Sequence, residues 1–112
     1  MLAKSFILKK RSDFEVVKDK GRLYQSPLFG MLVLSENVEE TKFGFLISKK
    51  VSKRAVDRNR IRRLTAEAVR FNLKGIKKKI WVVFLVKRKM LGLKQDEVRL
   101  EVENMMKMVG II

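Results

Sequence analysis

Residues 48–64 read SKKVSKRAVDRNRIRRL, and this stretch decides the fold that we expect. It holds eight Lys and Arg residues around a single acid, Asp57. At 3.6 residues per turn the stretch forms a helix with an apolar stripe along one side. The stripe extends beyond the stretch and comprises Ile61, Leu64, Ala68 and Phe71. We therefore expect a helix that packs into the core along this stripe and carries its basic side chains outward.

The basic side chains of this helix are mostly Arg, and they suit a polyanion. Those that point away from the stripe, together with one amide, are Asn59, Arg62, Arg63 and Arg70, while Arg58 and Arg60 flank the stripe. Guanidinium is planar and permanently charged, binds phosphate through a bidentate fork and stacks on bases. A solvated helix face usually alternates positive and negative charges, and this one does not. The pattern favours a surface for RNA backbone and unstacked bases.

The overall charge agrees with a polyanionic partner. The chain has 27 Lys and Arg against 12 Asp and Glu, a formal net charge of +15 and a pI near 10.5. Self-repulsion on this scale opposes the compact state unless a partner neutralises it. Because the charges are spread along the chain and not gathered on one amphipathic helix, nucleic acid is favoured over a membrane surface.

Missing residue types narrow the chemistry. The chain has no Cys and no His. This excludes disulfides, zinc sites built on these residues, thiol catalysis and imidazole acid–base catalysis. No apolar run reaches the roughly 20 residues that span a bilayer, and the N-terminus lacks the apolar region of a secretion signal. We expect a cytoplasmic protein.

The pattern of elements predicts one domain, residues 1–112, of the α+β class. Ser12 and Glu15 form a capping box that begins a short helix, and Gly21 ends it. Gly75 is the expected cap of the long helix, and the strands over 28–34 and 42–48 are expected to pair as a hairpin. The expected helices span 13–20, 55–72 and 96–109, and the expected strands span 23–26, 28–34, 42–48 and 80–86.

The order of these elements is αβββαβα. A long helix between two buried strands predicts a parallel pair joined by a crossover. With the helices on one face of the sheet, the architecture is a two-layer sandwich.

Several segments together resemble the bacterial ribonuclease P protein family. Arg58-Asn59-Arg60 and its neighbours resemble the family's RNR signature. Arg11-Ser12-Asp13-Phe14 followed by Gly21, the segment 43–50 and the segment 80–83 resemble its N-terminal motif, its strand before the RNR helix and its last strand. The resemblance covers about residues 7–109, and its RNR stretch is the most specific part.

The resemblance implies a fold and a function. The fold is a mixed four-stranded sheet with three helices and a left-handed crossover, the opposite of the general rule. The family is the protein subunit of a ribonucleoprotein endonuclease that removes the 5′ leader of precursor tRNA. The implied partners are ribonuclease P RNA and precursor tRNA, with no obligate protein partner and no membrane. Mg²⁺ acts through the RNA subunit and the substrate, and no protein residue is catalytic or binds the metal.

The resemblance also assigns site residues. Contact with the RNA subunit falls on Lys49, Lys50, Lys53, Arg54, Arg58, Asn59, Arg60, Arg62 and Arg63. The leader cleft falls on Arg11, Phe14, Lys18 and Leu32. Many members carry aromatic residues at the positions of Lys18 and Leu32, so Lys18 would replace stacking with a phosphate contact. Many also carry Gly-Asn before the RNR helix, where this chain has residues 51–54.

Other interpretations of the same residues remain open at this point. A ribosomal-type RNA-binding protein would have the same charge without a catalytic partner, and a nuclease acting alone would need metal ligands from Glu36, Glu39, Glu40 and Asp57. Phe14 is either a core anchor or a cleft residue, whereas Phe43, Phe45, Trp81 and Phe84 are expected in the core. The lysine-rich segments 77–79 and 87–89 are expected to give diffuse steering.

Overall fold

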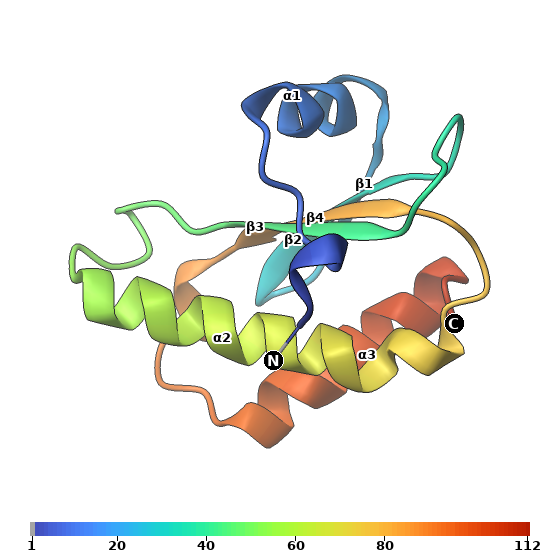
Figure 1. Ribbon diagram of the computed structural model, residues 1–112. Helices are drawn as coiled ribbons and strands as arrows, with labels where there is room; N and C mark the ends of the chain where they lie inside the picture. Colours follow the sequence, from blue (N-terminus) through green and yellow to red (C-terminus); the bar gives the residue numbers. More distant parts are fainter. Residues whose placement is uncertain (1) are drawn as a thin grey trace.

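The structure is a computed structural model that describes residues 2–112, and it confirms the expected order of elements (Figure 1). The helices are α1 (Arg11–Lys20), α2 (Ala55–Asn72) and α3 (Gln95–Val109). The strands are β1 (Arg22–Gln25), β2 (Phe29–Leu34), β3 (Lys42–Leu46) and β4 (Trp81–Val86). Short 3₁₀ turns are η1 (Lys4–Phe6), η2 (Leu73–Gly75) and η3 (Arg88–Met90).

The four strands form one mixed sheet in the order β1-β2-β4-β3. β3 and β4 are parallel and joined through α2, as predicted. In Figure 1, β3 lies in front of β4, both strands run toward the left, and α2 returns beneath the sheet, so the crossover is left-handed as the resemblance implied.

The predicted hairpin of β2 and β3 is wrong. β2 pairs antiparallel with β1 and β4, and β4 lies between β2 and β3. β4 is apolar on both faces, because Val82, Val83 and Phe84 are all fully buried. A strand with two apolar faces is best covered at the centre of a sheet. The connection over residues 35–41 therefore joins β2 to β3 across the position of β4.

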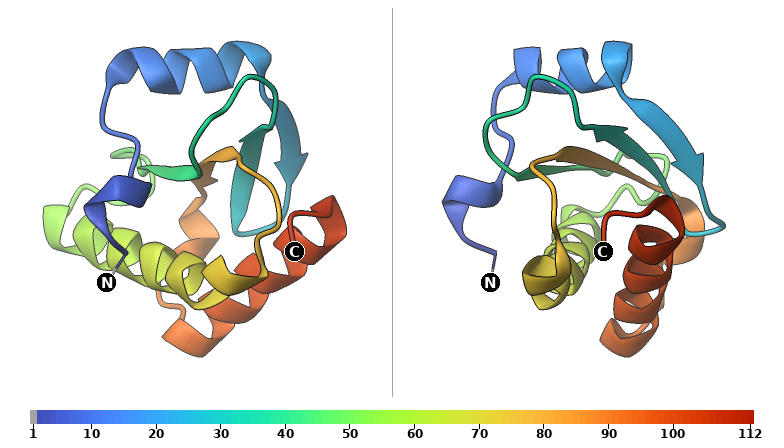
Figure 2. Two further views of the ribbon diagram at one scale, coloured as in Figure 1. Left: turned by 45° about the vertical axis from the view of Figure 1, so that its right-hand side comes forward. Right: turned by 90° about the vertical axis from the view of Figure 1, so that its right-hand side faces the viewer.

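Helices cover both faces of this sheet, so the expectation that they share one face is corrected (Figure 2). α2 and α3 pack against the face that carries Phe29, Phe43 and Phe84, where the rings of Phe45 and Phe84 stack at 5.6 Å. α1 lies on the opposite face and packs Val17 against the second cluster of the core. The two apolar clusters are separated by the sheet, and the expected core positions of the aromatic residues are confirmed, with Trp81 half-buried on the α1 side.

The α2 helix has the predicted bounds, but its buried stripe is turned relative to the prediction. Phe71 was expected in the stripe and is 57% exposed, with the Arg99 guanidinium 3.7 Å from its ring centre. Its side chain lies about 100° from the centre of the buried face at 100° per residue. The side chains that face the core are Ile61, Thr65, Ala68 and Val69.

The predicted helix caps are partly wrong. α1 begins at Arg11, so Ser12 lies inside the first turn, and the cap residue Lys10 makes no side-chain bond. α2 passes into η2, so Gly75 is not its cap. Gly21 ends α1 as predicted, and Gly110, with φ at 85°, ends α3 in the left-handed region.

Gly44 of β3 makes room for Phe14. A Cβ atom at Gly44 would lie 2.4 Å from Cε1 and 2.8 Å from Cζ of the Phe14 ring. Phe14 therefore packs its ring directly on the backbone of β3 and is half-buried there.

We expect Gly44→Ala to push the Phe14 ring off the sheet and to lower the free energy of unfolding by about 1–3 kcal/mol, as overpacking does. Urea denaturation measures this change. In a Phe14→Ala background the same substitution meets no ring, so its cost should largely disappear. An equal cost in both backgrounds would contradict the contact.

Candidate RNA interface

The turn before α2 is built around Ser52. Its hydroxyl accepts the N–H of Arg54 at 3.2 Å and donates to Oδ2 of Asp57 at 2.8 Å. Its carbonyl accepts Nη1 of Arg58 at 2.8 Å. Val51 beside it is only 4% exposed and anchors the turn in the core. These bonds fix the basic turn relative to the helix, which places Lys49, Lys50 and Lys53 on a defined surface.

Asp57 is part of this turn and not a free ligand. Arg54 Nε lies 3.9 Å from its Oδ2, and the carboxylate sits in the first turn of α2, where the helix dipole favours negative charge. Asp57 therefore forms an ion pair with Arg54. Within residues 2–112, no three acidic side chains come close enough together to hold a metal ion.

Two arginines of the signature bind the protein itself. Arg58 is half-buried and donates a hydrogen bond to the carbonyl of Ser52. Arg60 donates from Nη2 to the carbonyl of Leu93 at 2.9 Å, and this bond ties α2 to the loop before α3. Arg58 and Arg60, which were expected to flank the apolar stripe, therefore also hold parts of the fold together. Each guanidinium keeps further N–H donors for RNA, because it has five.

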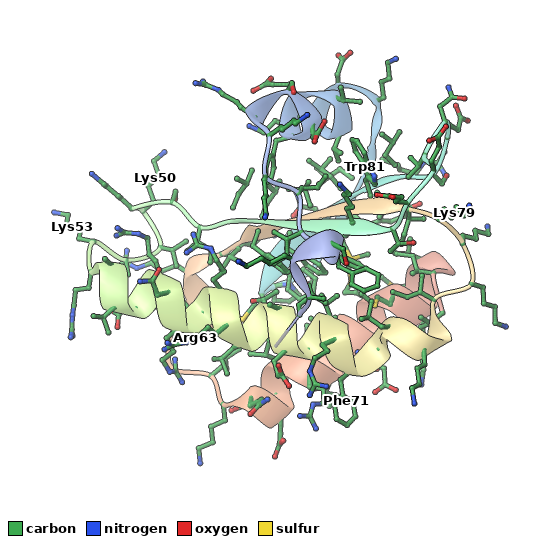
Figure 3. The ribbon with its side chains drawn as sticks, in the orientation of Figure 1. Lys50, Lys53, Arg63, Phe71, Lys79 and Trp81 are labelled. Carbon is green, nitrogen blue, oxygen red and sulfur yellow. The ribbon has the colours of Figure 1, made fainter. Side chains whose placement is uncertain are left out.

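The outward basic surface consists of Lys49, Lys50, Lys53, Arg54, Asn59, Arg62 and Arg63, all exposed. Asn59 Oδ1 accepts Nη1 of Arg62 at 3.1 Å and orients that guanidinium. Among the described residues, neither Arg62 nor Arg63 has an acidic partner within salt-bridge distance. In Figure 3, Lys50 and Lys53 extend from the turn before α2, and Arg63 lies on the side of α2 away from the sheet. We call this set the outward basic surface.

The residues expected to line the leader cleft lie on the α1 side of the sheet, but the side chain of Leu32 is not open to solvent as expected. Arg11 and Lys18 are exposed on α1, and Phe14 is half-buried between α1 and β3, so it anchors α1 on the sheet and keeps part of its ring accessible. Leu32 is only 7% exposed and belongs to the core beneath α1, because central strand β2 buries both faces here. It offers no open surface.

Three further leucines lie on the α1 side of the sheet. Leu46 and Leu85 are half-buried neighbours on adjacent strands, and Gly30 lies opposite Leu85. Leu23 on β1 is 48% exposed on the same face. The alternation of side chains in β4 could have indicated Leu85, but its position next to Leu46 required the pairing of β3 with β4.

The lysine-rich segments 77–79 and 87–89 differ in their contacts with the rest of the protein. Lys77, Lys78 and Lys79 are exposed, as expected for steering. Lys87 donates its ammonium to the carbonyl of Ser26 at 2.7 Å, so it has a structural role. No helix within residues 2–112 is both long and apolar enough to cross a membrane.

Comparison with known proteins decides the family. The ribonuclease P family model matches residues 2–110. The chain belongs to the ribonuclease P protein family. It is 31% identical over 106 residues to the ribonuclease P protein component of Clostridium novyi, covering 93% of each chain. It is 38% identical over 80 residues to that of Alkaliphilus metalliredigens, covering 71% of each.

Solved structures of ribonuclease P proteins share the fold. A mutant of the Staphylococcus aureus RNase P protein superposes with a TM-score of 0.87 at 20% identity, covering 97% of this chain and 92% of that one. The Thermotoga maritima RNase P protein gives a TM-score of 0.80 at 24% identity, covering 89% and 94%. With the family established, the chain is the protein subunit of a ribonucleoprotein endoribonuclease and works with ribonuclease P RNA.

Arg58 is bonded to the protein, whereas Arg62 and Arg63 are exposed, so truncating them to Ala should affect stability and RNA binding differently. Arg62→Ala and Arg63→Ala should change the free energy of unfolding by no more than about 0.5 kcal/mol, since both side chains are exposed. Each should weaken binding to ribonuclease P RNA by about 1.5–3 kcal/mol for every charge-assisted hydrogen bond that it removes. Arg58→Ala should also destabilise the fold, by about 1 kcal/mol, because it removes a hydrogen bond to the turn.

Thermal unfolding and RNA titration measure the two effects separately. Arg→Lys at positions 62 and 63 keeps the positive charge but removes the bidentate guanidinium. Relative to Arg→Ala, it should therefore restore only part of the affinity for the RNA. Full restoration by Lys would show that charge alone, without shape, binds the RNA.

Proposed function

We propose that this subunit binds the 5′ leader of precursor tRNA on the α1 side of the sheet while the outward basic surface holds ribonuclease P RNA. The observation that carries the proposal is the placement of these two surfaces. The start of α2 and the turn before it carry the arginines, while α1, which carries Phe14, lies across the sheet from α2 (Figure 1). One small domain can therefore touch both RNAs at once.

The cleft suits a single strand of RNA. Its apolar residues are Leu46 and Leu85 on the sheet and the half-buried Phe14 on α1, whose accessible part can contact a base. Arg11 and Lys18 on the same helix supply charge for the backbone. Since Lys18 stands where many relatives are aromatic, this chain relies more on phosphate contact than on stacking at that position.

The catalytic centre belongs to the RNA subunit, and Mg²⁺ acts there and on the substrate. The outward basic surface supports this role because it neutralises phosphates around the metal-binding RNA, which lowers the Mg²⁺ concentration required. Gripping the leader favours precursor over mature tRNA and so promotes release of product. Both RNAs are cytoplasmic in a bacterium, and we place the subunit there.

Cleavage of precursor tRNA tests the proposal with three reactions. The protein alone should not cut, ribonuclease P RNA alone should cut poorly at low Mg²⁺, and the two together should remove the leader efficiently. Cleavage by the protein alone would indicate an independent nuclease. Binding without any stimulation of cleavage would indicate a structural RNA-binding protein.

Substitutions in the cleft should affect the leader specifically. Lys18→Ala leaves the fold unchanged, because its side chain is exposed, and should weaken binding of leader-bearing precursor to the holoenzyme by about 1.5–3 kcal/mol if Lys18 binds one phosphate. Binding of mature tRNA should not change. Titration of both RNAs against the assembled holoenzyme measures this difference.

An exposed lysine outside the cleft serves as the control. Lys107→Ala lies on α3 and should leave both affinities unchanged. If Lys18→Ala weakens precursor and mature tRNA equally, the α1 face does not bind the leader.

A further inference from the structure

An apolar groove lies beside the outward basic surface. It has a volume of about 510 Å³ and runs between the N-terminal segment and α2. Most of its surface is apolar, and the apolar side chains that line it are Leu2, Ile7, Phe45, Leu64 and Ala66. This volume falls in the range of small-molecule sites, and the groove is open to solvent along one side.

Cationic side chains border this apolar groove. Arg60, Arg62 and Arg63 of α2 all line it. Arg60 is fixed by its bond to the Leu93 carbonyl, while Arg62 and Arg63 are exposed. The combination of an apolar slot with guanidinium groups at its border fits a ligand that has a flat apolar body and a phosphate.

The acid in the groove does not repel such a ligand strongly. Glu67 accepts Nε of Arg70 at 2.9 Å and also binds Nη2 of the same guanidinium. The bond from Arg70 lowers the pKa of Glu67 to about 2, so the carboxylate stays charged and remains engaged with its cation. Gln95, at the first position of α3, adds an amide that can donate to and accept from the edge of a base.

We propose that one unstacked nucleotide of the RNA subunit inserts its base into this groove and sets its phosphate against Arg62 or Arg63. The proposal rests on the proposed function, because that RNA is the strand held at the outward basic surface. Sequence-specific contacts to RNA are typically made to splayed bases that meet aromatic or guanidinium planes. Insertion of this base would fix the position of the outward basic surface along the RNA.

The test fills the groove without changing any charge. Ala66→Leu places a larger side chain inside it, and Asn104→Leu adds the same side chain at an exposed position of α3 as a control. The dissociation constant for ribonuclease P RNA is measured over a range of salt concentrations. Dimethyl sulfate modification of the RNA reports which bases the protein protects.

We expect Ala66→Leu to weaken binding at least about fivefold, since one stacked base contributes about 1–3 kcal/mol. The slope of log K against log salt should stay unchanged, because every phosphate contact is retained. Arg62→Ala, in contrast, should reduce the slope by about 0.7–0.9. One unpaired base should be protected by the native protein and by Asn104→Leu, and exposed with Ala66→Leu.

Three results would overturn the inference. If Ala66→Leu binds the RNA with native affinity and protects the same base, no base of the RNA occupies the groove. A reduced salt slope would show that the substitution acts through phosphate contacts. If the native protein failed to bind ribonuclease P RNA, the proposed function would be contradicted together with the proposed base site. The first two results contradict only the base site. If Ala66→Leu does not fold, Ala66→Val fills part of the groove and should reduce the affinity less, in the same direction.

Discussion

The burial of one face of α2 is the constraint on which the rest of this structure depends. Ile61, Ala68 and Val69 are fully buried against the sheet and α3. Burying side chains of this kind contributes about 1.5–3 kcal/mol each for the larger ones, which offsets repulsion among the basic residues of the same helix. Because this face fixes the rotation of α2, it also decides which arginines face water. The helix is at once a core element and the RNA-binding element.

Not every positive charge in the basic stretch has the same task. Ser52, Asp57 and Arg58 hold the turn, and Arg60 holds the loop before α3. Among the described residues Arg62 and Arg63 have no acidic partner, and Arg62 bonds to Asn59 on its own helix, so both are left for RNA. A protein with a net charge of +15 thus uses part of its positive charge to order the surface that the remainder presents.

Much of the fold could be predicted from the sequence, because it depends on local patterns. The bounds of α2 and the parallel pairing of β3 with β4 follow from periodicity and from the length of the connection. The neighbour of β2 could not be predicted locally, since it depends on the need of β4 for cover on both faces. The same holds for the site. Arg62 could be placed from helical spacing, whereas the burial of Leu32 and the bond of Arg58 to Ser52 depend on tertiary packing.

In this account the RNA subunit binds at the start of α2 and not over the whole basic surface. Modification of arginine by phenylglyoxal, read by mass spectrometry with and without ribonuclease P RNA, tests it most directly. We predict strong protection of Arg54, Arg62 and Arg63, while exposed Arg22 and Arg88 on other elements stay reactive. Equal protection of all five would contradict the claim, because the RNA would then be held by net charge alone.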